Sequence, residues 1–129
     1  MAKKILIIED QPPIVKLLKT RLKALGHDLV TAQDGHEGVE KVKMEVPDLI
    51  ITDLAMPKMT GNVVVRILKQ SQEFQHIPII MLSAFIRGNE NESVEVPADA
   101  YVPKPFDANA LMVRVQTLLE KAVKPKGSQ

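Results

Sequence analysis

The amino-acid sequence predicts an α/β fold in which a doubly wound, five-stranded parallel sheet carries helices on both faces. Two observations support this prediction. Five short apolar runs, each bounded by turn-forming residues, have the length and composition of strands that are buried on both faces. Segments with apolar residues at helical spacing alternate with these runs, and this alternation is typical of parallel sheets with crossover helices.

The composition of the chain limits its possible functions. Its 129 residues fit one domain, and 45% hydrophobic with 26% charged residues is typical of a soluble globular protein. The absence of cysteine excludes a disulfide framework, a thiolate nucleophile and a zinc–thiolate site. A formal charge of +1 and 3% aromatic residues give no basis for binding nucleic acid. We find neither a signal peptide nor a membrane-spanning segment, so we expect a cytoplasmic protein without membrane contact.

The first predicted strand, Lys4 to Ile8, ends at two acidic residues, Glu9 and Asp10. Two prolines then favour the first turn of a helix, where their missing N–H groups cost nothing, and Gly26 is a typical stop. The predicted buried stripe of this helix comprises Ile14, Leu17, Leu18, Leu22 and Leu25. A second, short strand is expected from Asp28 to Ala32.

Asp34, followed three residues later by Glu37, resembles a capping box and predicts a second helix that Pro47 ends. The buried residues expected on this helix are Val39, Val42 and Val46. A third strand then runs to Asp53, so that a single carboxylate follows an apolar segment.

A loop ending at Gly61 leads to a third predicted helix, Asn62 to Gln70, and a fourth strand, Pro78 to Leu82, ends at Ser83. The segment from Ala84 to Pro97 has the weakest pattern. Its helical candidate, Asn89 to Val94, is polar nearly all round, and we expect a short or mobile helix there.

The fifth predicted strand, Ala98 to Val102, is followed by Lys104. Asp107 is the expected cap of the last helix, with Phe106 and Leu111 at the positions of a hydrophobic staple. The predicted core stripe of this helix is Leu111, Val115, Leu118 and Ala122. We expect one domain over residues 1–123 and a flexible tail over 124–129.

Polar side chains from four strand ends are predicted to meet, because ligands of such sheets bind at the carboxyl ends of the strands. The five groups are Glu9, Asp10, Asp53, Ser83 and Lys104. Clustered carboxylates without histidine or cysteine suit a hard divalent cation such as Mg²⁺. A metal ion, a lysine and a hydroxyl are groups that stabilise a transferring phosphoryl group, and a strand-end aspartate is a plausible nucleophile.

Several motifs in a fixed order resemble the receiver domain of two-component response regulators, the CheY-like family. The motifs are Ile5 to Asp10, Pro47 to Gly61, Ser83-Ala84 and Tyr101 to Phe106. The resemblance extends from about Lys3 to Lys121. It implies the flavodoxin-like strand order 2-1-3-4-5 and a phospho-accepting switch rather than an enzyme, with only self-phosphorylation and slow autodephosphorylation.

The family resemblance also implies a role for each site residue. Asp53 corresponds to the phospho-accepting aspartate and, with Asp10 and the backbone carbonyl of Ala55, to a ligand of Mg²⁺ or Mn²⁺. Glu9 is expected to act through a metal-bound water. Lys104, Ser83 and Tyr101 correspond to the lysine, hydroxyl and aromatic residue that respond to the phosphoryl group.

The implied phosphodonor is a sensor histidine kinase or a phosphotransfer protein. The implied output surface, formed by the fourth predicted helix, the fifth strand and the last helix, changes its affinity for a downstream protein or output domain. The residues leave open whether the receiver stands alone or belongs to a longer regulator.

Two positions beside the site, Ala55 and Phe85, are apolar, and neither can orient an attacking water; we therefore expect slow loss of the phosphoryl group. Two alternatives are a HAD-like phosphohydrolase with an aspartyl-phosphate intermediate and a docking pseudo-receiver that is not phosphorylated. Ala55 stands where such a hydrolase has a second acid or a threonine. The presence of the acidic pair Glu9 and Asp10, together with Asp53 and Lys104, argues against a pseudo-receiver.

Overall fold

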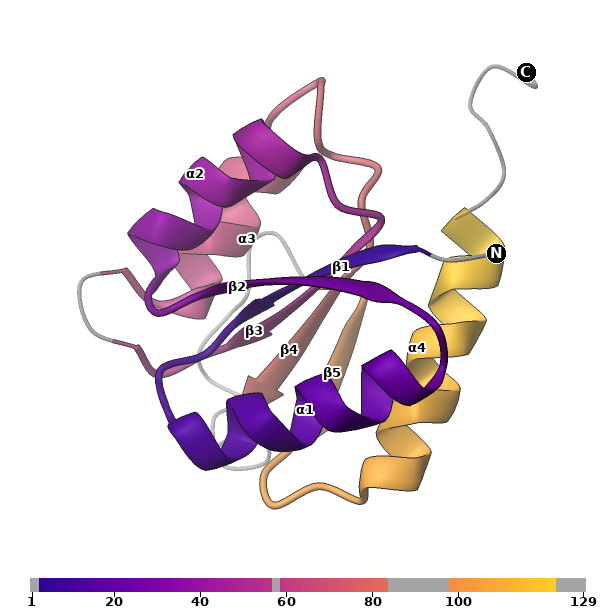
Figure 1. Cartoon of the computed structure of the whole chain (residues 1–129). Coiled ribbons are helices and arrows are strands. Elements are labelled where there is room, and N and C mark those ends of the chain that lie inside the picture. Colours follow the sequence, from indigo (N-terminus) through magenta and orange to yellow (C-terminus); the bar gives the residue numbers. More distant parts are fainter. Residues whose placement is uncertain (1–2, 57–58, 84–97, 123–129) are drawn as a thin grey trace.

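The computed structural model describes residues 3–56, 59–83 and 98–122 of the chain, and within them five strands and four helices (Figure 1). In chain order these are β1 (Lys4–Ile8), α1 (Pro12–Ala24), β2 (Asp28–Ala32), α2 (Gly35–Glu45), β3 (Leu49–Asp53), α3 (Gly61–Lys69), β4 (Ile79–Ser83), β5 (Ala100–Pro103) and α4 (Ala108–Ala122). No helix in this part of the chain has the length and apolar character that crossing a membrane requires. The helical candidate Asn89 to Val94 and the expected tail, 124–129, lie outside the described residues.

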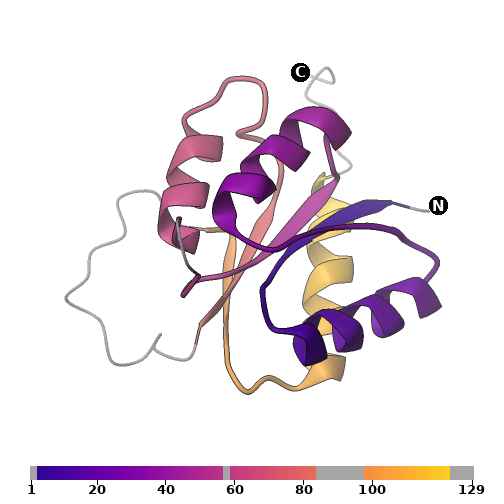
Figure 2. The ribbon, with the colours of Figure 1, turned by 60° about the vertical axis from the view of Figure 1, so that its left-hand side comes forward.

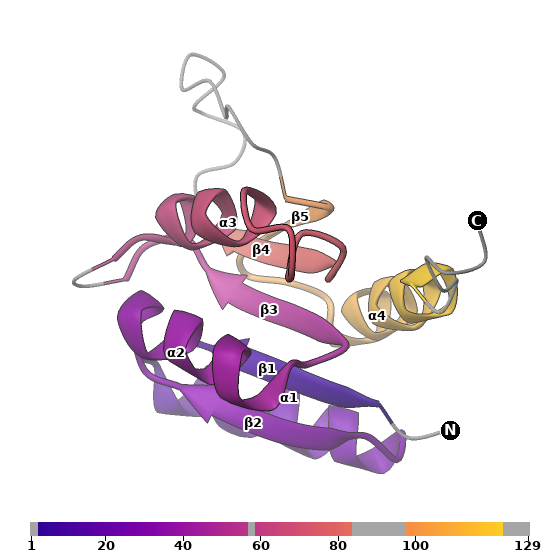
Figure 3. The ribbon, with the colours of Figure 1, turned by 90° about the horizontal axis from the view of Figure 1, so that it is seen from above.

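The five strands are all parallel and lie in the order β2-β1-β3-β4-β5, as the resemblance implied (Figure 3). The chain therefore starts near the middle of the sheet, moves to one edge at β2, and then returns to build the other side. The place where the winding reverses lies between β1 and β3, and their carboxyl ends form the crevice in folds of this type.

Helices cover both faces of the sheet, with α2 and α3 on one side and α1 and α4 on the other (Figure 2). Successive side chains of a strand point to opposite faces, so each inner strand contributes to two cores. In β1, Leu6 and Ile8 pack toward α2 and α3, whereas Ile5 and Ile7 pack toward α1 and α4. This double burial explains why the inner strands are continuous apolar runs. The edge strand β2 differs, because its central residues are only half-buried.

The predicted helix caps are confirmed. The Asp34 carboxylate accepts a hydrogen bond from Glu37 N (2.8 Å), and the Glu37 side chain accepts one from Gln33 N (2.8 Å). The Asp107 carboxylate accepts hydrogen bonds from the backbone of Asn109 and Ala110 at the start of α4. These acceptors satisfy N–H groups that have no partner within their own helix.

Three predicted core residues are exposed instead. Leu17 and Leu25 of the first helical segment face solvent, because the part of α1 that contacts the sheet is narrower than the apolar stripe in the sequence. Val46 follows α2 in the left-handed conformation (φ 44°) and is 51% exposed. Pro47 prevents another helical turn, so the chain turns at Val46 and carries its side chain away from the core.

Candidate functional site

The carboxyl ends of four parallel strands bring together five of the predicted site residues. Glu9 and Asp10 follow β1, Asp53 ends β3, and Ser83 ends β4. Lys104 directly follows β5, and its backbone N–H donates to the Ser83 carbonyl (2.9 Å). The strand registers place these ends at one edge of the sheet, with Ser83 paired to the last residue of β5.

The Lys104 ammonium group lies between two buried carboxylates. Its Nζ is 3.1 Å from Asp53 Oδ1 and 3.4 Å from Glu9 Oε1, and only 16% of the lysine side chain is exposed. Ion pairs screened from water interact more strongly than surface pairs, so this lysine fixes the position of the Asp53 carboxylate. The Lys104–Pro105 peptide bond is cis, which sequence analysis did not predict.

Glu9 is a buried acid beside Asp53 and Lys104. Burial raises the pKa of its carboxyl group, the nearby Asp53 carboxylate raises it further, and Lys104 together with the Gln11 N–H partly opposes both effects. Gln11 N donates to Glu9 Oε2 (3.2 Å), whereas the buried Oε1 accepts no hydrogen bond from the described residues. A buried oxygen with spare acceptor capacity is suited to a metal-bound water or a cation.

One carboxylate oxygen from each of Glu9, Asp10 and Asp53 lies within 4.8 Å of the others. Asp10 is exposed and the other two are buried, so the acidic pocket opens to solvent on the side of Asp10. Hard divalent cations prefer oxygen ligands of this kind, and Mg²⁺ binds with few carboxylates and several waters. The donor set therefore fits such an ion, and it would offset the repulsion among the three carboxylates.

Gly61, the first residue of α3, lies against the end of β3, a role that sequence analysis missed. A Cβ atom there would come within 2.5 Å of the Asp53 carbonyl oxygen and 2.6 Å of Met81 Sδ. The Gly61 N–H also donates to the Leu54 carbonyl (2.8 Å). Only glycine lets the helix approach the loop after Asp53 so closely. The position of Gly61 between a predicted loop and a predicted helix is the sequence feature that could have indicated this role.

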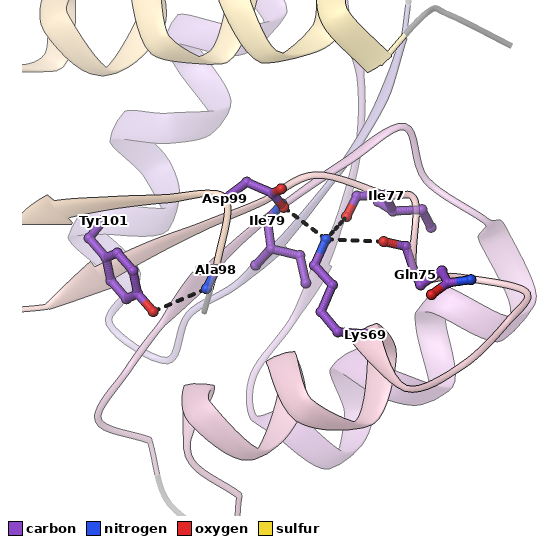
Figure 4. A network of polar contacts seen from close by, with 7 residues as sticks. All are labelled: Lys69, Gln75, Ile77, Ile79, Ala98, Asp99 and Tyr101. Carbon is purple, nitrogen blue, oxygen red and sulfur yellow. Dashed lines mark hydrogen bonds and ion pairs between the residues drawn. The ribbon is translucent and has the colours of Figure 1, made fainter. Parts of the chain in front are cut away.

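The two predicted switch residues lie in different surroundings. Ser83 is buried at the edge of the sheet that carries Asp53 and Lys104. Tyr101 is half-buried, its ring packs against the core beneath α2 and α3, and its hydroxyl accepts a hydrogen bond from Ala98 N (3.0 Å; Figure 4). This hydrogen bond ties the Tyr101 side chain to the backbone just before β5.

A second polar network, also unpredicted, fixes the start of β5 (Figure 4). The Lys69 ammonium group at the end of α3 donates to the carbonyls of Gln75 (3.1 Å) and Ile77 (3.0 Å) and to the Asp99 carboxylate (2.9 Å). The same Asp99 oxygen accepts a hydrogen bond from Ile79 N (2.7 Å). Lys69 thus connects α3, the loop before β4 and the strand that leads to Lys104.

Two predicted site residues, Ala55 and Phe85, remain to be located. Ala55 lies exposed in the loop after β3, two residues beyond Asp53. Phe85 lies outside the described residues.

Comparison with known proteins identifies the class to which this fold and acidic pocket belong. A sequence profile described as "Response regulator receiver domain" matches residues 5–116, which is most of the chain. The chain belongs to this family, whose members are phospho-accepting signalling switches, and the match does not favour the phosphohydrolase or the docking alternative.

Individual relatives agree with the family assignment. The chain is 38% identical over 125 residues to the alkaline phosphatase synthesis transcriptional regulatory protein PhoP of Bacillus subtilis (95% of this chain, 50% of that protein). It is 39% identical over 125 residues to the phosphate regulon transcriptional regulatory protein PhoB of Rhizobium meliloti (95% and 54%). The signal receiver domain of a histidine kinase from Syntrophus aciditrophicus superposes with a TM-score of 0.90 at 32% identity, covering 97% of this chain and 96% of that one. The chain spans about half the length of the curated relatives that it matches.

Proposed function

We propose that Asp53 accepts a phosphoryl group from the phosphohistidine of a sensor histidine kinase or phosphotransfer protein, in the cytoplasm. The observation that carries this proposal is the position of the Asp53 carboxylate. It is buried at the end of β3, 3.1 Å from Lys104 Nζ and beside two further carboxylates. A nucleophile held in place by a cation at a ligand crevice matches the demands of phosphoryl transfer.

In the transfer, an Asp53 carboxylate oxygen attacks phosphorus and forms an acyl phosphate. The phosphorus–nitrogen bond of the donor breaks, and the imidazole keeps the electron pair and takes a proton. Lys104 lies close enough to Asp53 to offset the charge that gathers on the phosphoryl oxygens. Its attachment to Glu9 holds the ammonium group in place before the donor arrives.

The residues suited to hold Mg²⁺, or Mn²⁺ in its place, are Asp10, Asp53 and the Ala55 carbonyl, with Glu9 acting through water. When bound, the ion supplies positive charge to the phosphoryl oxygens and lowers the repulsion between donor and acidic pocket. Burial and the neighbouring Asp53 carboxylate raise the pKa of Glu9, and the buried Glu9 Oε1 accepts no hydrogen bond from the described residues. Both observations support this assignment, because a cation would stabilise the Glu9 and Asp53 carboxylates.

After transfer, the phosphoryl dianion attracts the Ser83 hydroxyl and Lys104, and the loops after β3 and β4 rearrange. Tyr101 changes its contacts with them, because it lies on the strand between Lys104 and the Ala98 backbone. The surface formed by the predicted helix Asn89 to Val94, β5 and α4 then changes its affinity for a downstream protein or output domain. This is a population shift between two existing arrangements.

The output is proposed to be regulation of transcription through a further domain. PhoP and PhoB, which the chain resembles over about half of their length, are described as transcriptional regulatory proteins. We assign no direct contact with nucleic acid or membrane to the receiver itself.

Intact-mass measurement tests the acceptor. The protein is incubated with Mg²⁺ and acetyl phosphate, alongside Asp53→Asn and Asp28→Asn, the latter being an exposed aspartate at the start of β2. We expect one added phosphoryl group on the wild type and on Asp28→Asn, and none on Asp53→Asn. Repeated turnover of the donor would instead indicate a hydrolase, and a wild type without added mass would indicate a docking module.

We further propose that the receiver is not an enzyme acting on other molecules and that its phosphoryl group is lost slowly. Ala55 is exposed two residues after Asp53 and has no side chain that can orient a water, and Phe85 is equally apolar. Phosphate release from the purified phosphoprotein measures the lifetime. We expect Ala55→Asn to shorten it, and a wild-type lifetime of only seconds would contradict the proposal.

A further inference from the structure

A cleft of about 440 Å³ lies between α1 and the edge strand β2, on the side of the acidic pocket away from β3. Figures 1 and 3 show α1 running along β2 at this edge of the sheet. Glu9 and Asp10 line one end of the cleft, and Lys19 and Lys23 of α1 line the wall that leads away from them. Clefts of this volume commonly hold small organic ligands.

Three lysines of the cleft share one face of α1. Lys16, Lys19 and Lys23 are spaced by three and four residues, so their side chains leave the helix on one face and their like charges repel one another. Within the described part of the chain, none of the three makes an ion pair. By contrast, Lys4, Lys69 and Lys104 are each paired with a carboxylate. The α1 wall of the cleft therefore carries positive charge that no carboxylate of the described residues pairs with, whereas Glu9 and Asp10 line its other end.

The rest of the lining is suited to an organic molecule rather than to a bare anion. Val15 and Ala32 supply apolar surface, and Thr20 and Thr31 supply hydroxyl groups. The carboxylate of Asp10 can accept hydrogen bonds at the end opposite Lys23. A matching ligand carries negative charge at one end and hydrogen-bond donors at the other, with apolar surface between them.

We propose that this cleft binds a small organic phosphate of nucleotide size. Its phosphates lie against Lys19 and Lys23, where ammonium groups act as phosphate ligands. Its hydroxyl or amino groups point toward Asp10, and its uncharged part covers Val15. The cleft does not include Asp53, so ligand binding there does not require phosphorylation, but it shares Glu9 and Asp10 with the proposed metal site.

Amide chemical shifts of the full 129-residue chain test the proposal, with ADP as the probe and EDTA present to keep metal from Asp10. We expect saturable shifts at Val15, Thr20 and Thr31. The same titration uses sodium pyrophosphate and a pentaglutamate peptide. If either binds as tightly as ADP, simple charge attraction or an acidic protein segment explains the lysines, and the proposal is wrong.

Paired variants separate this site from general electrostatics. The double variant Lys19→Gln, Lys23→Gln should bind ADP at least tenfold more weakly. The charge-matched control Lys41→Gln, Lys43→Gln, on α2, should bind ADP as the wild type does. Spectra that are unchanged away from the substitutions establish that both variants are folded. Absence of saturable binding by the wild type, or equal weakening in the control, contradicts the proposal.

The Asp53→Asn variant distinguishes this inference from the proposed function. It should lose phosphorylation and bind ADP with unchanged affinity. Weaker ADP binding by Asp53→Asn would mean that the nucleotide occupies the phosphorylation site instead, and would overturn the assignment of the cleft.

Discussion

Replacing Lys69 by methionine is expected to destabilise the fold by about 2–3 kcal/mol. The ammonium group makes three hydrogen bonds, and only 15% of the lysine side chain is exposed. The carbonyl of Ile77 loses a charged donor in a part-buried place, which accounts for most of the loss. Gln75 is exposed and Asp99 is 37% exposed, so water replaces much of what they lose.

Urea unfolding measures this effect. With a denaturant dependence of about 2 kcal/mol per molar urea, the midpoint should fall by about 1 M with an unchanged slope. Lys43→Met on α2 removes an exposed lysine that makes no ion pair with the described residues and should leave the midpoint within about 0.2 M of the wild-type value. Adding Asp99→Asn to Lys69→Met should lower the midpoint little further, because both substitutions disrupt the same contact between Lys69 and Asp99. Equal midpoints for Lys69→Met and Lys43→Met would refute the reasoning.

Three further predictions concern single residues. Because the pKa of Glu9 is raised in the folded protein, the folded state binds more protons than the unfolded chain between the ordinary carboxyl range and the raised value. The free energy of unfolding therefore falls as pH rises through that window. In metal-free urea unfolding at a series of pH values, Glu9→Gln should show a smaller fall than the wild type, and parallel curves of stability against pH for the two proteins would contradict this. Gly61→Ala should cost about 1–3 kcal/mol and slow phosphorylation in an intact-mass time course, because its Cβ would meet the Asp53 carbonyl; unchanged stability would show that the loop can move aside. His27 is buried, accepts from Lys3 N (3.2 Å) and contacts Gln116 Oε1 (2.9 Å), so His27→Ala should cost about 2 kcal/mol by thermal unfolding, and a loss below about 0.5 kcal/mol would refute the role of these bonds.

Much of the fold was predictable because strong local signals agreed. Apolar runs that end in polar residues marked the strands, and the caps at Asp34 and Asp107 marked two helix starts. The site followed from the fold, since parallel strands must bring Glu9, Asp53 and Lys104 to one edge. The roles of individual residues came from family resemblance.

The remaining features depend on contacts between distant residues, which no local pattern records. Lys69 looks like any lysine at the end of a helix, yet it joins α3 to a carboxylate 30 positions away. Leu17 continues an apolar stripe but lies beyond the width of the contact with the sheet. Gly61 is needed because of the Asp53 carbonyl, and that approach exists only once α3 has packed.

The turn at Val46 offers a way to engineer this protein. A β-branched residue with φ of 44° costs conformational energy, on the order of 1–3 kcal/mol, that glycine or asparagine would not. Val46 lies just before β3 begins, at the opposite end of that strand from Asp53. Val46→Asn or Val46→Gly should therefore raise the margin of stability without touching the pocket. In that background, pocket variants too unstable to purify alone become accessible to study.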